Sequence, residues 1–415
     1  MASYLTVLIV AAAVTAAAAA ALTAAGRRFG WVQAPTARSM HTEPIVNVGG
    51  IALLLGFLAG MLVAWRTEQF AEMFRDNSEP LGIVLAAIVI TFVGALDDRQ
   101  DVSPPAKVAG IVLAASILAR LGVTMFYFRV PFNLGNLDTV VLSPDLAPLV
   151  TVLWVVLLTN AINLVDGLDG LAAGITAIAG GAFFLFSDRL FDRGFLDGSN
   201  VAPLVAMLTV GVCVGFLPFN FNPARIMMGD AGALLLGLLL AVPTITVGGR
   251  TDFAFSGNTY FFFAPLVIPI VILGVPVVDT VFSFFRRVLR GRQWSVGDRD
   301  HIHHRLVRLG HGPRRAVAIL WAWTALLSGV ALAPTFAGDG AGVNLNALVP
   351  FAIGALALVL YAAFHPGVRD ARERAVRARH PSRVTGPDEG DPGEAGPDVA
   401  RPNVVELEAR RRSAQ

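Results

Sequence analysis

The sequence is poor in charged residues and almost without cysteine and lysine. Only 15% of its 415 residues are charged, 55% are hydrophobic, and the mean hydropathy is +0.65. Cys213 is the single cysteine, which excludes a disulfide framework and a cysteine metal site. Lys107 is the single lysine among 32 basic residues. Lysine is a compact point charge suited to phosphate, so Lys107 is a candidate ligand for an anion. The alternative is that this single lysine is present by chance.

Long apolar segments occupy most of the chain. A hydrocarbon core about 30 Å thick requires roughly 20 residues of apolar helix. The sequence therefore predicts an all-α polytopic membrane protein with about eleven transmembrane helices. The segments cover approximately 3–25, 45–65, 80–96, 105–124, 147–163, 170–187, 202–218, 231–248, 260–285, 316–336 and 346–364. The first segment lacks a cleavage site and is too long for a signal-peptide core, so we expect it to be retained.

Basic residues predict the orientation and the domain organisation. Arginines are concentrated in alternate gaps between the apolar segments, which places the N-terminus outside and the C-terminus in the cytoplasm by the positive-inside rule. Residues 1–365 are expected to form one transmembrane domain with cytoplasmic loops. Residues 366–415 form a cytoplasmic tail, basic at first and then rich in Pro, Gly and acidic residues. Such a composition predicts disorder from about residue 380.

The polar motifs all fall in gaps on one side of the predicted membrane. Two apolar segments separate each motif from the next, so all of them face the arginine-rich, cytoplasmic side. We therefore expect one site at the cytoplasmic face of the plasma membrane. The motifs contain Asp97 and Asp98, then Asn163, Asp166 and Asp169, then Asp230, and finally the run from Asp298 to His304.

Two acidic motifs precede the middle of the chain. Asp97 and Asp98 are adjacent carboxylates at a membrane boundary, which indicates a role with a cation or a proton, although a solvated helix end is the alternative. Asn163, Asp166 and Asp169 recur at a spacing of three, so on a helical turn they would share one face. The glycine-rich surroundings also allow a tight turn in which these side chains only cap the backbone.

Two further aspartates lie next to or within apolar segments. Asp230 precedes the eighth segment, where it can cap a helix or face an anion bound at the helix N-terminus. Asp230 and Asn163 offer the hard oxygen ligands that Mg²⁺ prefers. Asp279 follows three prolines in the ninth segment, which predicts a bent or broken helix. An acid at this depth is a functional candidate, with an ion pair to Arg286 as the structural alternative.

The last long loop combines histidines with arginines. His301, His303 and His304 do not have the spacing of a zinc helix, and the neighbouring Arg299 and Arg305 would repel a cation. Imidazole and guanidinium groups suit the oxygens of a diphosphate and a sugar, so we interpret the loop as an anion site. A basic loop lying on anionic headgroups is the alternative, and it leaves the histidines unexplained.

Taken in order, the motifs resemble the polyprenyl-phosphate N-acetylhexosamine-1-phosphate transferase family of the WecA and TagO type, with MraY a more distant relative. The resemblance covers about residues 25–315. It rests on six segments, ARSMHTEPIVNVGG, DDRQDVSP followed by Lys107, NAINLVDGLDGLAAG, NPARIMMGDAG, PVVDT and DRDHIHHRL.

The resemblance implies transfer of a sugar 1-phosphate from a UDP-sugar to a membrane lipid, undecaprenyl or decaprenyl phosphate, with release of UMP. It implies Mg²⁺, with Mn²⁺ as an alternative ion, and no nucleic-acid partner. In this family scheme Asp230 and Asn163 hold the metal, and Asp97 or Asp98 promotes attack by the lipid phosphate as base or as nucleophile. The remaining substrate-binding residues would be Lys107, Asp166, Asp169, Met227, Asp279, Arg299, His301, His303, His304 and Arg305.

Alternatives to this donor and to this function remain open. The form of the histidine loop favours UDP-GlcNAc, while another UDP-HexNAc, including UDP-MurNAc-pentapeptide, remains an alternative donor. Met227 and Ala233 stand where relatives usually carry an aromatic residue and a serine, and Gln33 and Ala34 replace a commonly acidic stretch. An ion-coupled transporter also uses buried acids and broken helices, and a scaffold for wall synthesis leaves the carboxylates unexplained. A homodimer is a further expectation.

Overall fold

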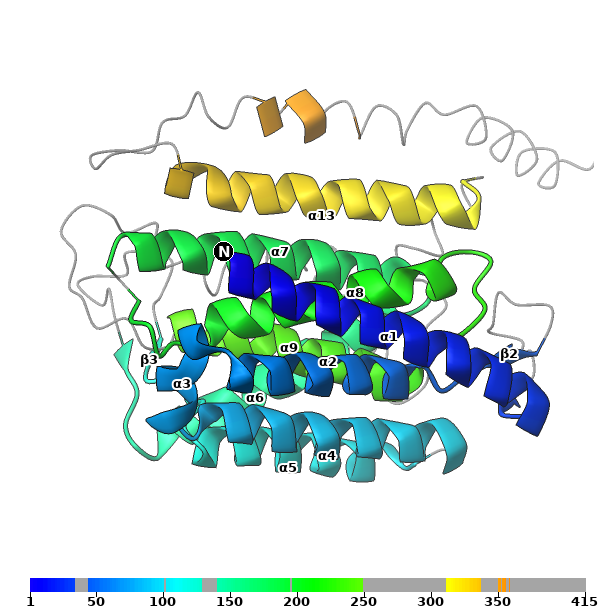
Figure 1. Cartoon of the computed structure of the whole chain (residues 1–415), viewed down its shortest axis with the longest axis horizontal. Helices are drawn as coiled ribbons and strands as arrows, with labels where there is room; N and C mark the ends of the chain where they lie inside the picture. Colours follow the sequence, from blue (N-terminus) through cyan, green and yellow to red (C-terminus); the bar gives the residue numbers. More distant parts are fainter. Residues whose placement is uncertain are drawn as a thin grey trace, which may run out of the picture. The chain divides into compact units, whose positions relative to one another are not determined.

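A computed structural model describes residues 1–33, 44–100, 102–128, 140–194, 196–248, 311–336, 350–351, 353–355 and 358, all within one compact unit, Met1–Arg372. Its helices are α1 (Ala2–Phe29), α2 (Gly49–Arg66), the 3-10 helix η1 (Glu68–Phe70), α3 (Ala71–Arg75), α4 (Glu79–Gln100), α5 (Pro104–Arg120), α6 (Leu146–Val165), α7 (Leu171–Asp192), α8 (Ala202–Asn220), α9 (Gly229–Gly248) and α13 (Pro313–Phe336) (Figure 1). Two short antiparallel pairs complete the described part, β1 (Val32–Gln33) with β2 (Ile45–Val46) and β3 (Tyr127–Phe128) with β4 (Val140–Val141).

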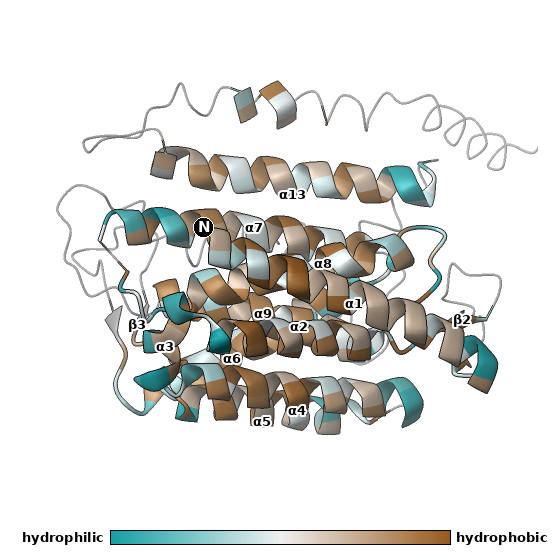
Figure 2. Ribbon diagram, in the orientation of Figure 1, coloured by the Kyte–Doolittle hydropathy of each residue, from teal (hydrophilic) through white to brown (hydrophobic). Residues whose placement is uncertain are grey.

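The class predicted from the sequence, an all-α polytopic membrane protein, is confirmed. Within the described ranges, eight helices are long and apolar enough to cross a membrane, and α5 has 17 residues. Hydrophobic residues run along the helices, and hydrophilic residues gather at helix ends and in loops (Figure 2). The predicted segment 260–285 and most of 346–364 lie outside the described residues, as does the tail. The count of eleven helices, their orientation and the division at residue 365 stay predictions.

Helix α9 is the centre of the bundle. It contacts α2, α4, α6, α7 and α8, and nearly all of its side chains are buried. A helix that is apolar on every side belongs in a protein core or in a membrane, and here the neighbouring helices rather than lipid cover most of α9. Its few polar groups are paired internally, as in the hydrogen bond that Trp154 Nε1 donates to Thr244 Oγ1 over 2.7 Å.

Glycines allow the first turn of α9 to touch α2 and α4. A Cβ atom on Gly94 of α4 would lie 2.4 Å from Ala231 Cα, and one on Gly50 of α2 would lie 2.4 Å from Gly232 N. Both distances are shorter than any van der Waals contact, so the helices approach this closely only because these positions carry no side chain. The first turn of α9 is therefore held against α2 and α4 by direct backbone contact.

Backbone hydrogen bonds join the chain before α2 to the chain before α9. Met227 N donates to Val46 O over 2.8 Å, Gly49 N donates to Met227 O over 2.9 Å, and Gly50 N donates to Met228 O over 3.0 Å. These bonds satisfy donors at the start of α2 that a helix cannot satisfy internally. As a result, the N-terminal ends of α2 and α9 are fixed side by side.

Replacing Gly94 with alanine tests this close packing. We expect Gly94→Ala to push α4 away from α9 and to lower stability by about 1–3 kcal/mol, because the new methyl group meets backbone that cannot move freely. Gly181→Ala on α7 is the matched control, since a Cβ there meets nothing within 4 Å. Thermal unfolding of the purified protein measures both, and equal midpoints for the two variants would contradict the packing described.

Candidate active site

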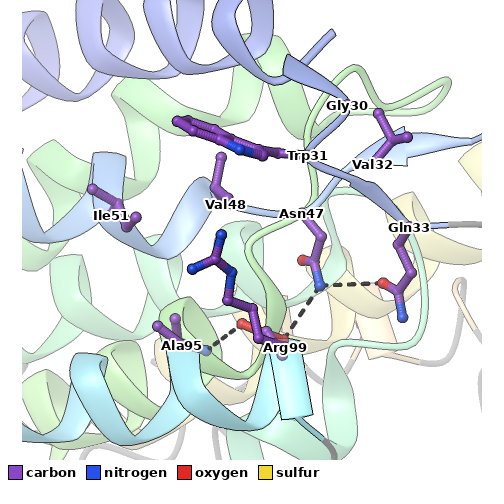
Figure 3. A pocket seen from close by; sticks show the side chains of 11 residues that line it. Gly30, Trp31, Val32, Gln33, Asn47, Val48, Ile51, Ala95 and Arg99 are labelled. Atoms are coloured by element: carbon purple, nitrogen blue, oxygen red, sulfur yellow. Dashed lines mark hydrogen bonds between the residues drawn. The ribbon is translucent and has the colours of Figure 1, made fainter.

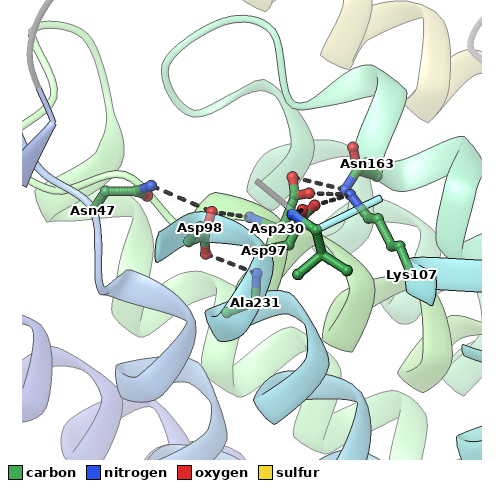
Figure 4. A network of polar contacts seen from close by, with 8 residues as sticks. Asn47, Asp97, Asp98, Lys107, Asn163, Asp230 and Ala231 are labelled. Carbon is green, nitrogen blue, oxygen red and sulfur yellow. Dashed lines mark hydrogen bonds and ion pairs between the residues drawn. The ribbon is translucent and has the colours of Figure 1, made fainter. Parts of the chain in front are cut away.

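Five polar side chains meet where four helices begin or end (Figure 4). Asp97 and Asp98 lie in the last turn of α4, Lys107 in the first turns of α5, Asn163 in the last turn of α6 and Asp230 in the first turn of α9. The sequence placed these residues on one side of the membrane, and the structure brings them into direct contact at one end of the bundle. We call this set the acidic cluster.

Lys107 joins the two acidic helices of the cluster. Its Nζ forms an ion pair with Asp97 Oδ2 over 2.8 Å and a second one with Asp230 Oδ2. The three side chains are only 19%, 14% and 30% exposed, respectively, so little solvent screens the pairs. The ammonium therefore offsets the repulsion between carboxylates of α4 and α9.

The other oxygens of this pair of aspartates are also hydrogen-bonded. Asn163 Nδ2 donates to Asp230 Oδ1 over 2.9 Å, which links α6 to α9. Val102 N donates to Asp97 Oδ1 over 2.9 Å in the turn between α4 and α5. Both aspartates thus have fixed side-chain positions before any ligand binds.

Asp98 caps helix α9 from a neighbouring helix. Its Oδ1 accepts a hydrogen bond from Asp230 N over 2.9 Å, and its Oδ2 accepts one from Ala231 N over 3.1 Å. Free amides at a helix N-terminus bind a carboxylate well because both charge and dipole favour it. Gly229, at φ +63°, leads into α9, and a Cβ there would lie 2.4 Å from Asp98 Oδ2. Asp98 therefore holds Asp230 at its place in the cluster.

Asn47 is a member of the site that the sequence reasoning missed. Its Nδ2 donates to Asp98 Oδ1 over 3.3 Å and to Gln33 Oε1 over 3.1 Å. Asn47 lies in the segment VNVGG at the start of α2, and the signal for it in the sequence was the presence of this segment among those shared with the resembling family. It connects the β1–β2 pair to the acidic cluster.

A cavity of about 670 Å³ opens beside Asp98 (Figure 3). Its lining combines apolar and polar side chains from α2, α4, α9 and the chain after α1. The lining residues are Gly30, Trp31, Val32, Gln33, Asn47, Val48, Ile51, Ala95, Asp98, Arg99 and Ala231. Such a lining suits a ligand with both polar and apolar parts.

The expectation that Asn163, Asp166 and Asp169 share one helical face is wrong. Helix α6 ends at Val165, Asp166 is its C-terminal cap residue, and α7 begins only at Leu171 after Gly170, which has φ +77°. Gly167 and Gly170 interrupt the helix because glycine favours turn conformations. Asn163 remains within the helix, where it donates a hydrogen bond to Asp230.

Asp169 holds the loop that leads to α9. Its Oδ2 accepts hydrogen bonds from Asn222 Nδ2 over 2.9 Å and from Ala224 N over 3.0 Å. The buried Asn220, also missed by the sequence reasoning, accepts from Gly170 N and donates to Ile226 O, each over 3.0 Å. These bonds lock the turn after α6 to the loop before α9. The predicted nucleotide-binding role of Asp169 stays a prediction.

Asp166 carries a carboxyl group at the start of this turn. Burial raises the pKa of its carboxyl group to about 8, and the nearby carboxylates of Asp230, Asp98 and Asp169 act in the same direction. A carboxyl group in such surroundings is protonated at neutral pH unless a cation compensates its charge. The site thus holds more acidic groups than its described basic group can neutralise.

The acidic cluster fits a magnesium ion by its donor chemistry. No three His, Cys, Asp or Glu side chains in the described part of the chain gather as in a closed metal cage. Magnesium, however, is commonly held by one or two carboxylates together with water and substrate phosphates. Asp97 and Asp230, with the amide oxygen of Asn163, offer such a partial set.

Of the remaining residues singled out in the sequence, the structure describes Met227 and Ala233. Met227 is half-buried next to the start of α9, with its backbone hydrogen-bonded to Val46 and Gly49. Ala233 is fully buried, where a serine hydroxyl would need a partner. The predicted loop residues Asp279, Arg299, His301, His303, His304 and Arg305 lie outside the described residues.

Together, the bundle and the acidic cluster define a polytopic membrane protein with a polar site at one end of its helices. The family model of glycosyl transferase family 4 matches residues 80–248, which contain the whole cluster. The chain is 35% identical over 300 residues to the decaprenyl-phosphate N-acetylglucosaminephosphotransferase of Mycobacterium leprae, covering 72% of this chain and 75% of the relative. The protein therefore belongs to glycosyl transferase family 4.

Two other relatives extend the comparison. A probable undecaprenyl-phosphate N-acetylglucosaminyl 1-phosphate transferase of Bacillus subtilis is 33% identical over 322 residues, covering 77% of this chain and 80% of the relative. The phospho-N-acetylmuramoyl-pentapeptide-transferase of Staphylococcus aureus is 28% identical over 297 residues, covering 68% and 83%. The two relatives named for N-acetylglucosamine are thus more similar to this chain than the one named for the muramoyl pentapeptide.

The capping role of Asp98 is testable by a conservative change. Asp98→Asn puts an NH₂ group where one carboxylate oxygen accepts a backbone N–H, so we expect a loss of about 1–3 kcal/mol in the free energy of unfolding. Asp145→Asn is the control, because Asp145 is exposed before α6 and makes no side-chain capping bond. Thermal or denaturant unfolding compares them, and an unchanged Asp98→Asn variant would refute the cap.

The raised pKa of Asp166 predicts a pH-dependent stability difference. An unfolded aspartate ionises near pH 3.9, whereas Asp166 in the folded protein ionises at about 8. Between these values the folded protein keeps a proton that the unfolded chain has released, so its stability falls as pH rises. Asp166→Asn carries no titrating group and should gain stability relative to the wild type over that window.

Unfolding midpoints without divalent ions, at about pH 5 and about pH 8.5, measure this difference. The gain of Asp166→Asn over the wild type should be larger at the higher pH. A gain that is the same at both pH values would show that Asp166 has an ordinary pKa.

Proposed function

We propose that this protein transfers N-acetylglucosamine 1-phosphate from UDP-N-acetylglucosamine to a polyprenyl phosphate in the membrane and releases UMP. The observation that carries the proposal is the convergence of Asp97, Lys107, Asn163 and Asp230 at the ends of four membrane helices. The names of the mycobacterial and Bacillus relatives support the acceptor and the sugar. The lipid-linked product would begin a wall or surface polysaccharide.

Phosphoryl transfer depends mainly on alignment and on neutralisation of charge, and the cluster supplies both. Asp230 and Asn163 would hold Mg²⁺, which neutralises the diphosphate of the donor. Lys107, within reach of both aspartates, would place its ammonium against phosphate oxygens. Asp166 and Met227 lie in the turn and the loop next to the cluster, where they would contact the nucleotide. Asp279 and the predicted His301–Arg305 segment would contribute to diphosphate and sugar binding.

The contacts of the two adjacent aspartates favour different roles for them. Both carboxylate oxygens of Asp98 are occupied by amides of α9, so Asp98 would act by positioning Asp230. Asp97 accepts a hydrogen bond from Val102 N and pairs with Lys107, and its lysine-bound oxygen faces the cluster. Of the two adjacent aspartates, Asp97 is therefore the better candidate to contact the reacting groups, through the oxygen that pairs with Lys107.

A site at the cytoplasmic face of the plasma membrane would meet both substrates. The nucleotide sugar is soluble, and the phosphate of a polyprenyl lipid lies at the membrane surface. The arginine-rich gaps on the side of the motifs support this orientation.

An ion-coupled transporter is the alternative from another class, and the location of the acids argues against it. Transporters place coupling residues near the bilayer midplane. Asp97 lies near the last residue of α4, and Asp230 is the second residue of α9. Transport activity in proteoliposomes without UMP release would favour the transporter.

The reaction is tested with purified protein, UDP-N-acetylglucosamine, polyprenyl phosphate and Mg²⁺. We expect UMP release that EDTA abolishes and that Asp230→Asn lowers on the order of 100-fold or more, because a group that neutralises charge in the transition state is lost. Asp76→Asn, an exposed aspartate after α3, is the control and should keep full activity. Competition among UDP-sugars in the same assay identifies the donor. No UMP release from any UDP-N-acetylhexosamine would overturn the proposal.

A further inference from the structure

Lys107 occupies the place that a metal ion would need. Its Nζ lies between Asp97 Oδ2 and Asp230 Oδ2, and these carboxylates are the acidic ligands that the cluster offers to Mg²⁺. An ammonium and a divalent cation at the same two oxygens repel each other strongly at this short range. Lysine and metal therefore cannot both make their full contacts with this pair of carboxylates.

The location of Lys107 on its helix has an electrostatic cost. It is the fourth residue of α5, whose first turn contains two prolines and no acid. Positive charge near a helix N-terminus is unfavourable because the helix dipole is positive there. The ion pairs with Asp97 and Asp230 offset this cost, so the lysine depends on the two carboxylates or on another anion that replaces them.

A diphosphate is such an anion. If phosphate oxygens reach the cluster, Lys107 Nζ gains new partners and the carboxylates become free for a metal ion. Metal and substrate then favour each other's binding through a single side chain. This reciprocal effect is a coupling free energy, and such couplings typically change an affinity by about 5–150-fold.

We propose that Lys107 is an internal counter-ion that competes with Mg²⁺ for Asp97 and Asp230 and moves to the diphosphate when the nucleotide sugar binds. Mg²⁺ then binds weakly to the free protein and tightly together with the substrate. The competition for Mg²⁺ follows from the ion pairs alone, whereas the release by a nucleotide sugar rests on the proposed function.

The first arm of the test measures metal binding without any nucleotide. Mn²⁺ serves as the probe, because the EPR signal of the free ion reports its binding to the full-length purified protein, and Mg²⁺ is then titrated in competition. We expect Lys107→Met to bind both ions at least about fivefold more tightly than the wild type. Equal or weaker binding by Lys107→Met would overturn the proposal.

Two further variants separate this effect from general electrostatics. Arg99→Met removes one positive charge from an exposed side chain next to Asp98 and should change the affinity much less than Lys107→Met. Lys107→Arg keeps a cation between the carboxylates and should retain weak metal binding. A similar gain for Arg99→Met and Lys107→Met would show that only the net charge matters, and would contradict the proposal.

Lys107→Met leaves carboxylates of α4 and α9 facing each other, so its stability is part of the test. We expect a lower unfolding midpoint than the wild type without divalent ions, and recovery when Mg²⁺ or Mn²⁺ is added. If the variant fails to fold without metal, it is purified with Mn²⁺ bound, and a competing chelator titrated into the variant and the wild type compares their affinities. A loss of stability that metal does not restore would contradict the competition.

The second arm adds UDP-N-acetylglucosamine. The nucleotide sugar should tighten Mn²⁺ binding to the wild type about as much as the substitution Lys107→Met does without a nucleotide. In Lys107→Met, the nucleotide sugar should change the Mn²⁺ affinity much less. Tighter metal binding by Lys107→Met together with no UMP release by the wild type from any UDP-sugar would uphold the counter-ion and refute the proposed reaction. UMP release by the wild type together with unchanged metal affinity in Lys107→Met would uphold the reaction and refute the counter-ion.

Discussion

The structure depends on one electrostatic constraint, which is the need to hold several carboxylates together at the end of an apolar bundle. The ion pairs of Lys107 with Asp97 and Asp230 and the capping of α9 by Asp98 meet this need. Buried like charges are unstable without such partners. The ends of α4, α5 and α9 carry these partners. The site therefore requires that the positions of these three helix ends be fixed.

The packing of α9 fixes the position of the Asp230 carboxylate. Its sides are surrounded by α2, α4, α6, α7 and α8, and its first turn touches α2 and α4 through Gly50 and Gly94. The backbone hydrogen bonds that Met227 N donates to Val46 O and that Gly49 N donates to Met227 O fix the approach to that turn. Asp230 follows immediately, so its location is set mainly by backbone contacts, which few substitutions can adjust.

Much of this arrangement could be predicted from the sequence, and the rest could not for a physical reason. Lengths of apolar segments gave the helices, and the parity of the gaps put Asp97, Asn163 and Asp230 at one end. Asp98 and the backbone amide of Asp230 are 132 residues apart, so no local pattern indicates that they form a hydrogen bond. The spacing of Asp166 and Asp169 favoured a helical face, but the glycines end the helix and form a turn there. Asn47 was missed because a single asparagine carries no periodic signal.

The central claim is that the acidic cluster is where metal and diphosphate meet. It is tested most directly by the structure of the protein crystallised with Mn²⁺ and a non-reactive UDP-sugar analogue, in which the anomalous scattering of manganese locates the ion. The account predicts one manganese ion coordinated by Asp230 and in contact with phosphate oxygens, and Lys107 turned from the carboxylates towards the diphosphate. Manganese and diphosphate bound away from Asp97 and Asp230, with the lysine ion pairs intact, would contradict it.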